Sequence, residues 1–142
     1  MFFTLPIAEV LTRTGRHQRA LDEVAAAQRD ARDAGLRVYE PELLRLRSVL
    51  LASSDRKEAL RSLEEAIELA RSQSSKSFEL RAAMSLCRLQ RGKSRAMTLD
   101  EIRRLYESFT EGFDTRDLLD AKAILGAPAT SGRTERRGRR HA

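Results

Sequence analysis

Apolar residues recur along the chain at intervals of three and four, between short breaks that carry glycine or polar residues. In the stretch 17–34, Ala20, Val24, Ala27 and Ala31 follow one another at spacings of four, three and four. An α-helix brings residues at these intervals onto one face. The pattern predicts six helical segments, near residues 5–14, 17–34, 41–51, 55–70, 77–90 and 98–112, and a short last helix at 114–125.

Capping signals mark several of the expected helix ends. Gly35 is suited to the left-handed conformation that commonly follows a helix C-terminus. Asp55 with Glu58, and Thr98 with Glu101, have the spacing of a capping box, in which side chains at the start of a helix accept bonds from free backbone amides. We therefore expect helices to begin close to Asp55 and close to Thr98.

The apolar pattern repeats with a period of 39 residues. A constant period of about 20 to 50 residues, with two helices per unit, is typical of an α-solenoid, whose units bury their apolar faces against their neighbours. We predict one all-α domain over residues 1–125, made of stacked antiparallel helix pairs at about 1–36, 37–75 and 76–112, plus the helix 114–125. The recurring triplets are Ala20, Val24 and Ala27, then Ala59, Leu63 and Ala66, then Thr98, Ile102 and Leu105.

Composition supports an all-α fold of about six or seven helices. The chain has 142 residues, the length of one domain. Ala, Leu, Glu, Lys and Arg make up more than half of it, tryptophan is absent, and glycine occurs only seven times. This composition is typical of long helices and argues against sheet-rich folds.

The formal charge of +6 is concentrated at the C-terminal end. Residues 126–142 contain five arginines against Glu135, which leaves the remainder of the chain nearly neutral. These residues have no apolar pattern, so we predict a disordered basic tail. Nucleic-acid binding through this tail is the weakest of the functional hypotheses, because a basic segment is only an electrostatic footprint.

The sequence predicts a cytoplasmic protein. Residues 1–10 lack the basic start of a signal peptide and include Glu9. No apolar run approaches the roughly 20 residues of a membrane span, so no membrane partner is expected. The single cysteine, Cys87, has no partner for an internal disulfide, which fits a reducing compartment.

No motif predicts catalysis, and we expect no enzyme activity, cofactor or metal site. Residues 92–94 read Gly-Lys-Ser, but a phosphate-binding loop needs a glycine where Cys87 stands, and a strand before it. His17 and His141 are the only histidines and lack neighbouring catalytic partners. Cys87 lies on an apolar helix face, where a small buried hydrophobe is expected.

Two other groups of side chains have structural explanations. Tyr106, Phe109 and Phe113 could form a base-stacking platform, but helical spacing puts the first two on the apolar stripe of Ile102 and Leu105, which favours the core. The glutamates of the fourth helix are interleaved with arginine, and we interpret them as a solvated face. They are Glu64, Glu65 and Glu68.

The first unit resembles a tetratricopeptide repeat in the order of its large, small and glycine positions. The resemblance implies a right-handed solenoid, although the second unit has Arg47 and Ser54 where a small residue and glycine are usual, and the third has Thr98 and Leu105 in the alanine positions. The terminal proline is missing and the unit is longer than is usual in the family. The residues that fit are Ile7, Ala8, Leu11, Gly15, Ala20, Val24 and Ala27.

The resemblance implies that the first helices of the pairs line a concave groove for a peptide or a neighbouring domain. In this register Arg13, Arg45 and Arg91 project toward the groove, where they could bind acidic side chains or a carboxylate. Chaperone-type members of the family hold a terminal carboxylate with asparagines, and other residues occupy those positions here, which disfavours such a clamp. They are Glu9, Ser48 and Cys87.

A narrower resemblance covers about residues 5–125. The segments 37–51, 78–89 and 109–125 are similar to the C-terminal helical repeats of large bacterial proteins in which a class III nucleotide cyclase domain and a P-loop ATPase domain precede the repeats. The most specific segment is FTEGFDT at 109–115. Those catalytic domains are absent from this chain, so the resemblance carries no activity over to it.

The leading hypothesis is a noncatalytic protein-interaction scaffold, a C-terminal fragment or short paralogue of a larger signalling protein. The alternative is a regulatory segment of a nucleotide cyclase or ATPase that functions only when joined to the catalytic part. The apolar start, with Phe2, Phe3 and Leu5, lacks a capping helix and could mediate self-association. These residues could equally fold back onto the first helix pair.

Overall fold

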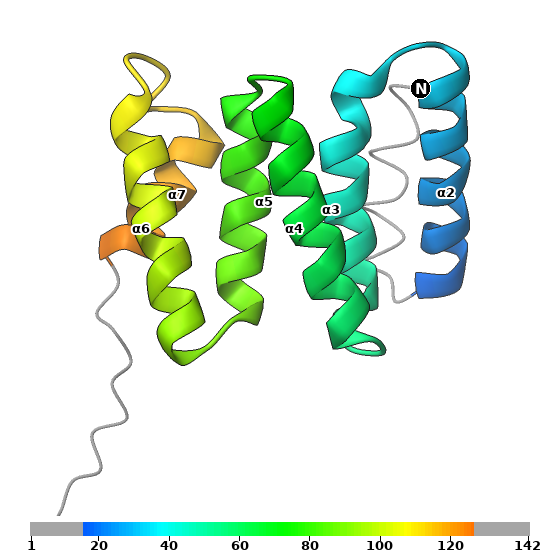
Figure 1. Cartoon of the computed structure of the whole chain (residues 1–142), viewed down its shortest axis with the longest axis horizontal. Helices are drawn as coiled ribbons and strands as arrows, with labels where there is room; N and C mark the ends of the chain where they lie inside the picture. Colours follow the sequence, from blue (N-terminus) through cyan, green and yellow to red (C-terminus); the bar gives the residue numbers. More distant parts are fainter. Residues whose placement is uncertain (1–15, 127–142) are drawn as a thin grey trace, which may run out of the picture.

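The computed structural model describes residues 16–126, and within this range it confirms an all-α fold (Figure 1). The expected helix 5–14, the tail beyond residue 126, and the residues Phe2, Phe3, Leu5 and Arg13 lie outside this range. A short 3-10 turn, η1 (Arg37–Tyr39), precedes α3. The six α-helices of the described range are α2 (His17–Asp33), α3 (Glu40–Leu51), α4 (Arg56–Ser72), α5 (Lys76–Leu89), α6 (Gly92–Ser108) and α7 (Arg116–Gly126).

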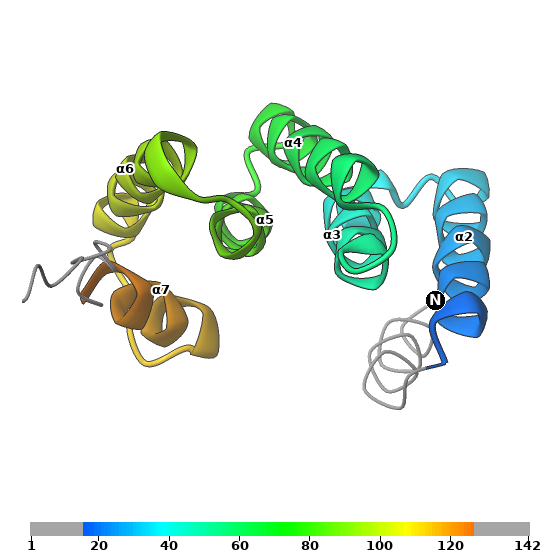
Figure 2. The same cartoon turned by 90° about the horizontal axis from the view of Figure 1, so that it is seen from below.

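Consecutive helices run in opposite directions and pack in sequence order, as expected for stacked helix pairs (Figure 1). Helix α5 also contacts α3 on one side and α7 on the other. Seen end-on, the helices follow an arc in which α3, α5 and α7 form the inner layer and α2, α4 and α6 the outer layer (Figure 2). Few contacts join helices that are far apart in the sequence, so each helix packs mainly on the helices next to it along the chain.

Small residues let the outer helices approach the inner layer closely. Ala59, Ala66 and Ala70 are fully buried along one face of α4, and Leu63 fills the space between them. The corresponding face of α2 is likewise made of buried alanines and one larger residue, Val24. The core is therefore a series of apolar clusters distributed along the stack.

The 39-residue period recurs in the helix ends. Gly35 follows α2 at φ +70°, and Ser74 follows α4 at φ +54°. In each case the next residue donates its backbone N–H to the carbonyl five residues earlier, at 2.7 and 2.9 Å. This 6→1 bond is the Schellman arrangement that satisfies carbonyls at a helix C-terminus. The prediction for Gly35 is confirmed, and the serine at the equivalent position adopts the same conformation.

The same period relates two ion pairs between consecutive helices. Arg32 Nε lies 3.1 Å from Glu40 Oε1, and Arg71 Nε lies 2.8 Å from Glu79 Oε1. Both pairs connect the last turn of an outer helix to the first turn of the following inner helix. The recurrence in sequence therefore corresponds to a recurrence of local geometry.

The start of α4 was predicted correctly and the start of α6 was not. Asp55 accepts a hydrogen bond from the backbone N–H of Glu58 at 3.1 Å, although the Glu58 carboxylate pairs with Arg47 instead of closing a capping box. Helix α6 begins at Gly92, so Thr98 lies inside it and is buried. Arg95 donates to the Cys87 carbonyl and anchors this additional first turn on α5.

Helix α6 also ends earlier than expected, at Ser108 instead of near Gly112. Residues 109–115 form the turn to α7, in which Gly112 adopts φ +75° and Thr115 Oγ1 donates to the Gly112 carbonyl. The FTEGFDT segment thus shapes this turn. Between residues 16 and 126, no helix combines the length and apolar character that crossing a bilayer requires.

Candidate functional site

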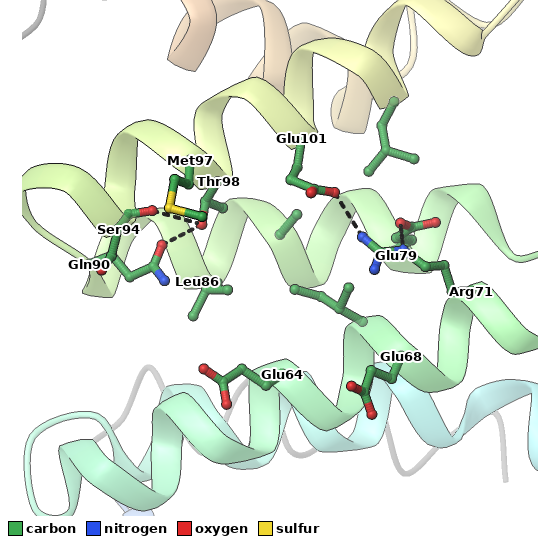
Figure 3. Close-up of a pocket in the computed structure, with 13 residues that line it drawn as sticks. Glu64, Glu68, Arg71, Glu79, Leu86, Gln90, Ser94, Met97, Thr98 and Glu101 are labelled. Carbon is green, nitrogen blue, oxygen red and sulfur yellow. Dashed lines mark hydrogen bonds and ion pairs between the residues drawn. The ribbon is translucent and has the colours of Figure 1, made fainter.

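A groove of about 330 Å³ lies between α4 and α6, with α5 as its floor (Figure 3). Its two walls belong to helices of the outer layer. Helices α4 and α6 each pack on α5, and this arrangement leaves a hollow between the two outer helices. The lining residues are Glu64, Ile67, Glu68 and Arg71 of α4, Glu79, Ala83 and Leu86 of α5, Gln90, and Ser94, Met97, Thr98, Glu101 and Leu105 of α6.

Helical spacing explains why these side chains share one groove. Residues 64, 67, 68 and 71 lie three or four apart and so occupy one face of α4. The α6 residues from 94 to 105 follow the same rule. One continuous face of each outer helix therefore forms a wall.

The groove has an apolar base. Ala83 and Leu86 of α5 are buried beneath it, and Ile67 and Leu105 contribute from the two walls. The side chain of Met97 is 62% exposed to solvent, which is unusually high for a large apolar residue. Covering such surface removes apolar area from water, which favours association.

Arg71 joins all three helices at one end of the groove (Figure 3). Its Nε donates to Glu79 Oε1 at 2.8 Å, and its Nη2 donates to Glu101 Oε2 at 2.8 Å. The hydrogen bond to Glu79 raises the pKa of Arg71, against the opposing effect of partial burial, and the surrounding carboxylates raise it further. Arg71 therefore remains a cation and holds Glu79 and Glu101 in place.

Two carboxylates on the α4 wall, those of Glu64 and Glu68, are exposed and form no hydrogen bond or ion pair with the residues that the structure describes (Figure 3). Four glutamates and one arginine line the groove. The groove is therefore electronegative, and its two unpaired carboxylates are available to an external cation.

The other end of the groove is polar but internally satisfied. The Thr98 hydroxyl is hydrogen-bonded to the Gln90 side-chain carbonyl and lies 3.2 Å from the Ser94 carbonyl. Figure 3 shows these groups gathered where α5 passes into α6. The Thr98 hydroxyl is therefore held within the chain.

The groove presents charged, polar and apolar side chains. Its walls carry carboxylates, an arginine, hydroxyls and apolar groups, with no histidine or cysteine among them. Across residues 16–126 no group of three or more His, Cys, Asp and Glu side chains is arranged to hold a metal ion. Apolar contact and charge are the interactions that this surface provides.

Arg45, one of the arginines expected to face a partner, is occupied within the inner layer. Its guanidinium donates to both carboxylate oxygens of Glu42, at 2.9 and 2.8 Å. Glu42 lies 3.3 Å from Arg81, which in turn lies 2.8 Å from Asp117 of α7. Burial by itself lowers the pKa of Arg81, but the hydrogen bond to Asp117 and the charge of Glu42 outweigh it and raise this pKa. The network connects α3, α5 and α7.

Arg91 is exposed in the turn before α6 and pairs with no carboxylate of the described chain. Arg13 lies outside the described residues. The groove was not predicted from the sequence. Glu64 and Glu68 were expected on a solvated face, and the site was expected on the first helices of the pairs. The available signal was the position of Glu64 and Glu68 beside Ile67 at helical spacing.

Cys87 is completely buried, as expected for a small hydrophobe. Residues 92–94 form the first turn of α6 and follow helix α5, so the strand that a phosphate-binding loop requires does not precede them. Tyr106 and Phe109 pack against the cluster around Ile102, which confirms their assignment to the core. Phe113 is 45% exposed and packs against Tyr106 with ring centroids 5.7 Å apart.

Comparisons with protein-family models, curated proteins and solved structures return no match to this chain. The helix order and packing establish an all-α stack of helix pairs. No family is assigned to the chain.

Proposed function

We propose that the chain is a noncatalytic protein-interaction module of the tetratricopeptide-repeat type, which binds a segment of a partner protein in the groove between α4, α5 and α6. The observation that carries this proposal is the groove itself, with an apolar base and unpaired charges on its rim. Protein-binding surfaces commonly combine an apolar centre with a polar rim.

The recurrence of contacts supports the repeat assignment. The left-handed residue and the ion pair that follow α2 recur 39 residues later, after α4. In this assignment α3 with α4 and α5 with α6 are successive units, and α2 is the second helix of the first unit. Each unit then buries its apolar face against the next.

The proposal is tested by site-specific photocrosslinking in the source cell. Benzoylphenylalanine placed at Met97, which is exposed and lines the groove, should give a discrete crosslinked product with a partner. The same residue placed at Val49, which is 41% exposed on α3 and does not line the groove, should not give that product. Equal crosslinking from both positions, or none from Met97, would contradict the proposal.

A second candidate function is a regulatory segment of a larger signalling enzyme. Its support is the similarity of segments 37–51, 78–89 and 109–125 to the C-terminal repeats of nucleotide cyclase and ATPase proteins. An antibody against residues 37–51 distinguishes the candidates on a denaturing immunoblot. A band near 16.1 kDa favours a free-standing module, and a much larger band containing these peptides favours the regulatory segment.

A further inference from the structure

We propose that the segment bound in the groove is a basic amphipathic α-helix of a partner protein. This inference rests on the proposed function and specifies the chemistry of the partner. Three features lead to it: the apolar base of the groove, its unpaired carboxylates, and the absence of a strand edge among the described residues.

The charge of the groove selects a cationic partner. Glu79 and Glu101 are already held by Arg71, whereas Glu64 and Glu68 are unpaired on the α4 wall. Arginine or lysine side chains placed along this wall would form ion pairs there. A partner with acidic side chains at the same positions would be repelled, and like-charge repulsion is an effective means of excluding wrong partners.

The apolar base requires more than charge from the partner. The apolar strip of the groove consists of Ile67 from the α4 wall, Leu86 from the base and Leu105 from the α6 wall, and the exposed Met97 also lines the groove. A ligand that formed only ion pairs at the rim would leave this apolar strip exposed to solvent. The partner segment must therefore present apolar side chains toward the base and cations toward the α4 wall.

The backbone of the partner favours a helix. The described residues contain helices and no strand, so an extended peptide finds no sheet edge here with which to pair its amides and carbonyls. The Thr98 hydroxyl is already bonded to the Gln90 side-chain oxygen and lies near the backbone carbonyl of Ser94. A helix satisfies its own backbone groups, and it presents apolar anchors at positions i, i+3, i+4 and i+7. A volume of about 330 Å³ accommodates such anchors.

The chain's own tail fits this description only in part. It supplies five arginines, but residues 127–142 contain no valine, leucine, isoleucine, methionine, phenylalanine or tyrosine. It can match the charge of the α4 wall and cannot cover the apolar strip. A separate protein segment therefore fits the groove better than the tail does.

The test is fluorescence anisotropy with the full chain and three labelled helical peptides of about 15 residues, a length that gives a marginal helix on its own. The first peptide carries leucines at helical spacing with arginines on both flanks. The second has glutamate in place of arginine, and the third has glutamine in place of leucine. We expect the first peptide to bind at least about tenfold more tightly than either of the others.

Matched variants locate the binding. The double substitution Glu64→Gln and Glu68→Gln should weaken binding of the first peptide by about tenfold and reduce its salt dependence. Glu65→Gln removes an equally exposed carboxylate of α4 that does not line the groove, and should change binding by less than about twofold. Circular dichroism of each variant verifies that its helices are retained, and the salt dependence of the wild-type chain tests the charge argument without any substitution.

The failure of this inference is distinguishable from failure of the proposed function. Ser94→Trp fills the groove from an exposed position, and Ser53→Trp is its control outside the groove. If the glutamate peptide binds as well as the arginine peptide and only Ser94→Trp blocks it, the groove is a binding site and the basic partner is wrong. If neither Ser94→Trp nor the glutamate substitutions affect binding, both proposals are wrong. If the peptide binds only after deletion of residues 127–142, the tail is the occupant and the partner proposal is overturned.

Discussion

At the scale of single residues, burial decides what a side chain contributes, and residues of one type differ widely. Leu63 is fully buried between α4 and the inner layer, whereas Leu119 of α7 is half exposed. Helical periodicity identified Leu63 as a core residue. The same periodicity did not identify the partners of Arg71, because its ion pairs with Glu79 and Glu101 depend on how three helices are placed.

We expect Leu63→Ala to lower the free energy of unfolding by about 2 to 5 kcal/mol, since it removes buried methyl groups and leaves a cavity. Leu119→Ala makes the same chemical change on an exposed helix face and should cost less than about 0.5 kcal/mol. Urea unfolding followed by far-ultraviolet circular dichroism measures both. Equal losses would show that the assigned burial of Leu63 is wrong.

The buried Cys87 makes stability depend on pH. Burial raises the pKa of its thiol, although the charges of Arg95 and Arg88 oppose this. The thiol of the unfolded chain ionises near its ordinary pKa of about 8.5. Above that pH the unfolded chain holds fewer protons than the folded one, so stability is fully present below about pH 8.5 and falls as the pH rises toward the folded pKa.

We therefore expect the free energy of unfolding to decrease more between about pH 7.5 and pH 9.5 for the wild-type chain than for Cys87→Ser, whose hydroxyl does not titrate in this range. Chemical denaturation at both values gives the two differences. The serine variant serves as the control for all other groups that titrate. An identical decrease in both proteins would contradict the prediction.

At the scale of helices, the chain's local signals located most of the ends. The break after α2 and the start of α4 follow from Gly35 and Asp55, because each residue acts on the backbone within a few positions of itself. The start of α6 was misplaced because a threonine followed three residues later by glutamate also occurs inside helices. There Thr98 is buried by packing against α5, which no local signal reports.

The two equivalent helix ends allow a reciprocal experiment. Ser74 adopts a left-handed conformation that glycine tolerates better, so Ser74→Gly should raise the free energy of unfolding by about 0.5 to 1 kcal/mol. Gly35→Ser should lower it by about 1 kcal/mol through the backbone alone, since an added Cβ there meets no atom within 4 Å. Thermal and urea unfolding of both variants provide the measurement. A gain from Gly35→Ser, or a loss from Ser74→Gly, would contradict this account.

At the scale of the whole molecule, stability is distributed by neighbour contact. Helix α4 packs between α3 and α5, whereas α7 packs only on α5 and α6 and does so at the end of the described stack. In such a stack a terminal element can open without its neighbours, because few interactions connect distant parts.

We therefore expect native-state hydrogen exchange to be slowest for the amides of α4 and at least about tenfold faster for those of α7, because local opening of a terminal element requires less free energy than global unfolding. Nuclear magnetic resonance resolves Leu63 and Leu118, which are both buried. Equal protection at the two positions would indicate a single cooperative unit and would contradict the neighbour model.

The sequence by itself determined the all-α class, the apolar faces, most helix ends and the period of 39 residues, because each depends on interactions within one helix or one repeat. Only the tertiary structure decided which faces meet. The groove exists because α4 and α6 pack on α5 with a hollow between them, and Arg71 connects to Glu101 across 30 residues of chain. Arg81 joins Glu42 of α3 to Asp117 of α7, a connection that no spacing within one helix predicts. Spacing along one helix shows which side chains share a face. Which helix packs against that face depends on tertiary packing. The candidate site lies where this packing leaves a helix face uncovered.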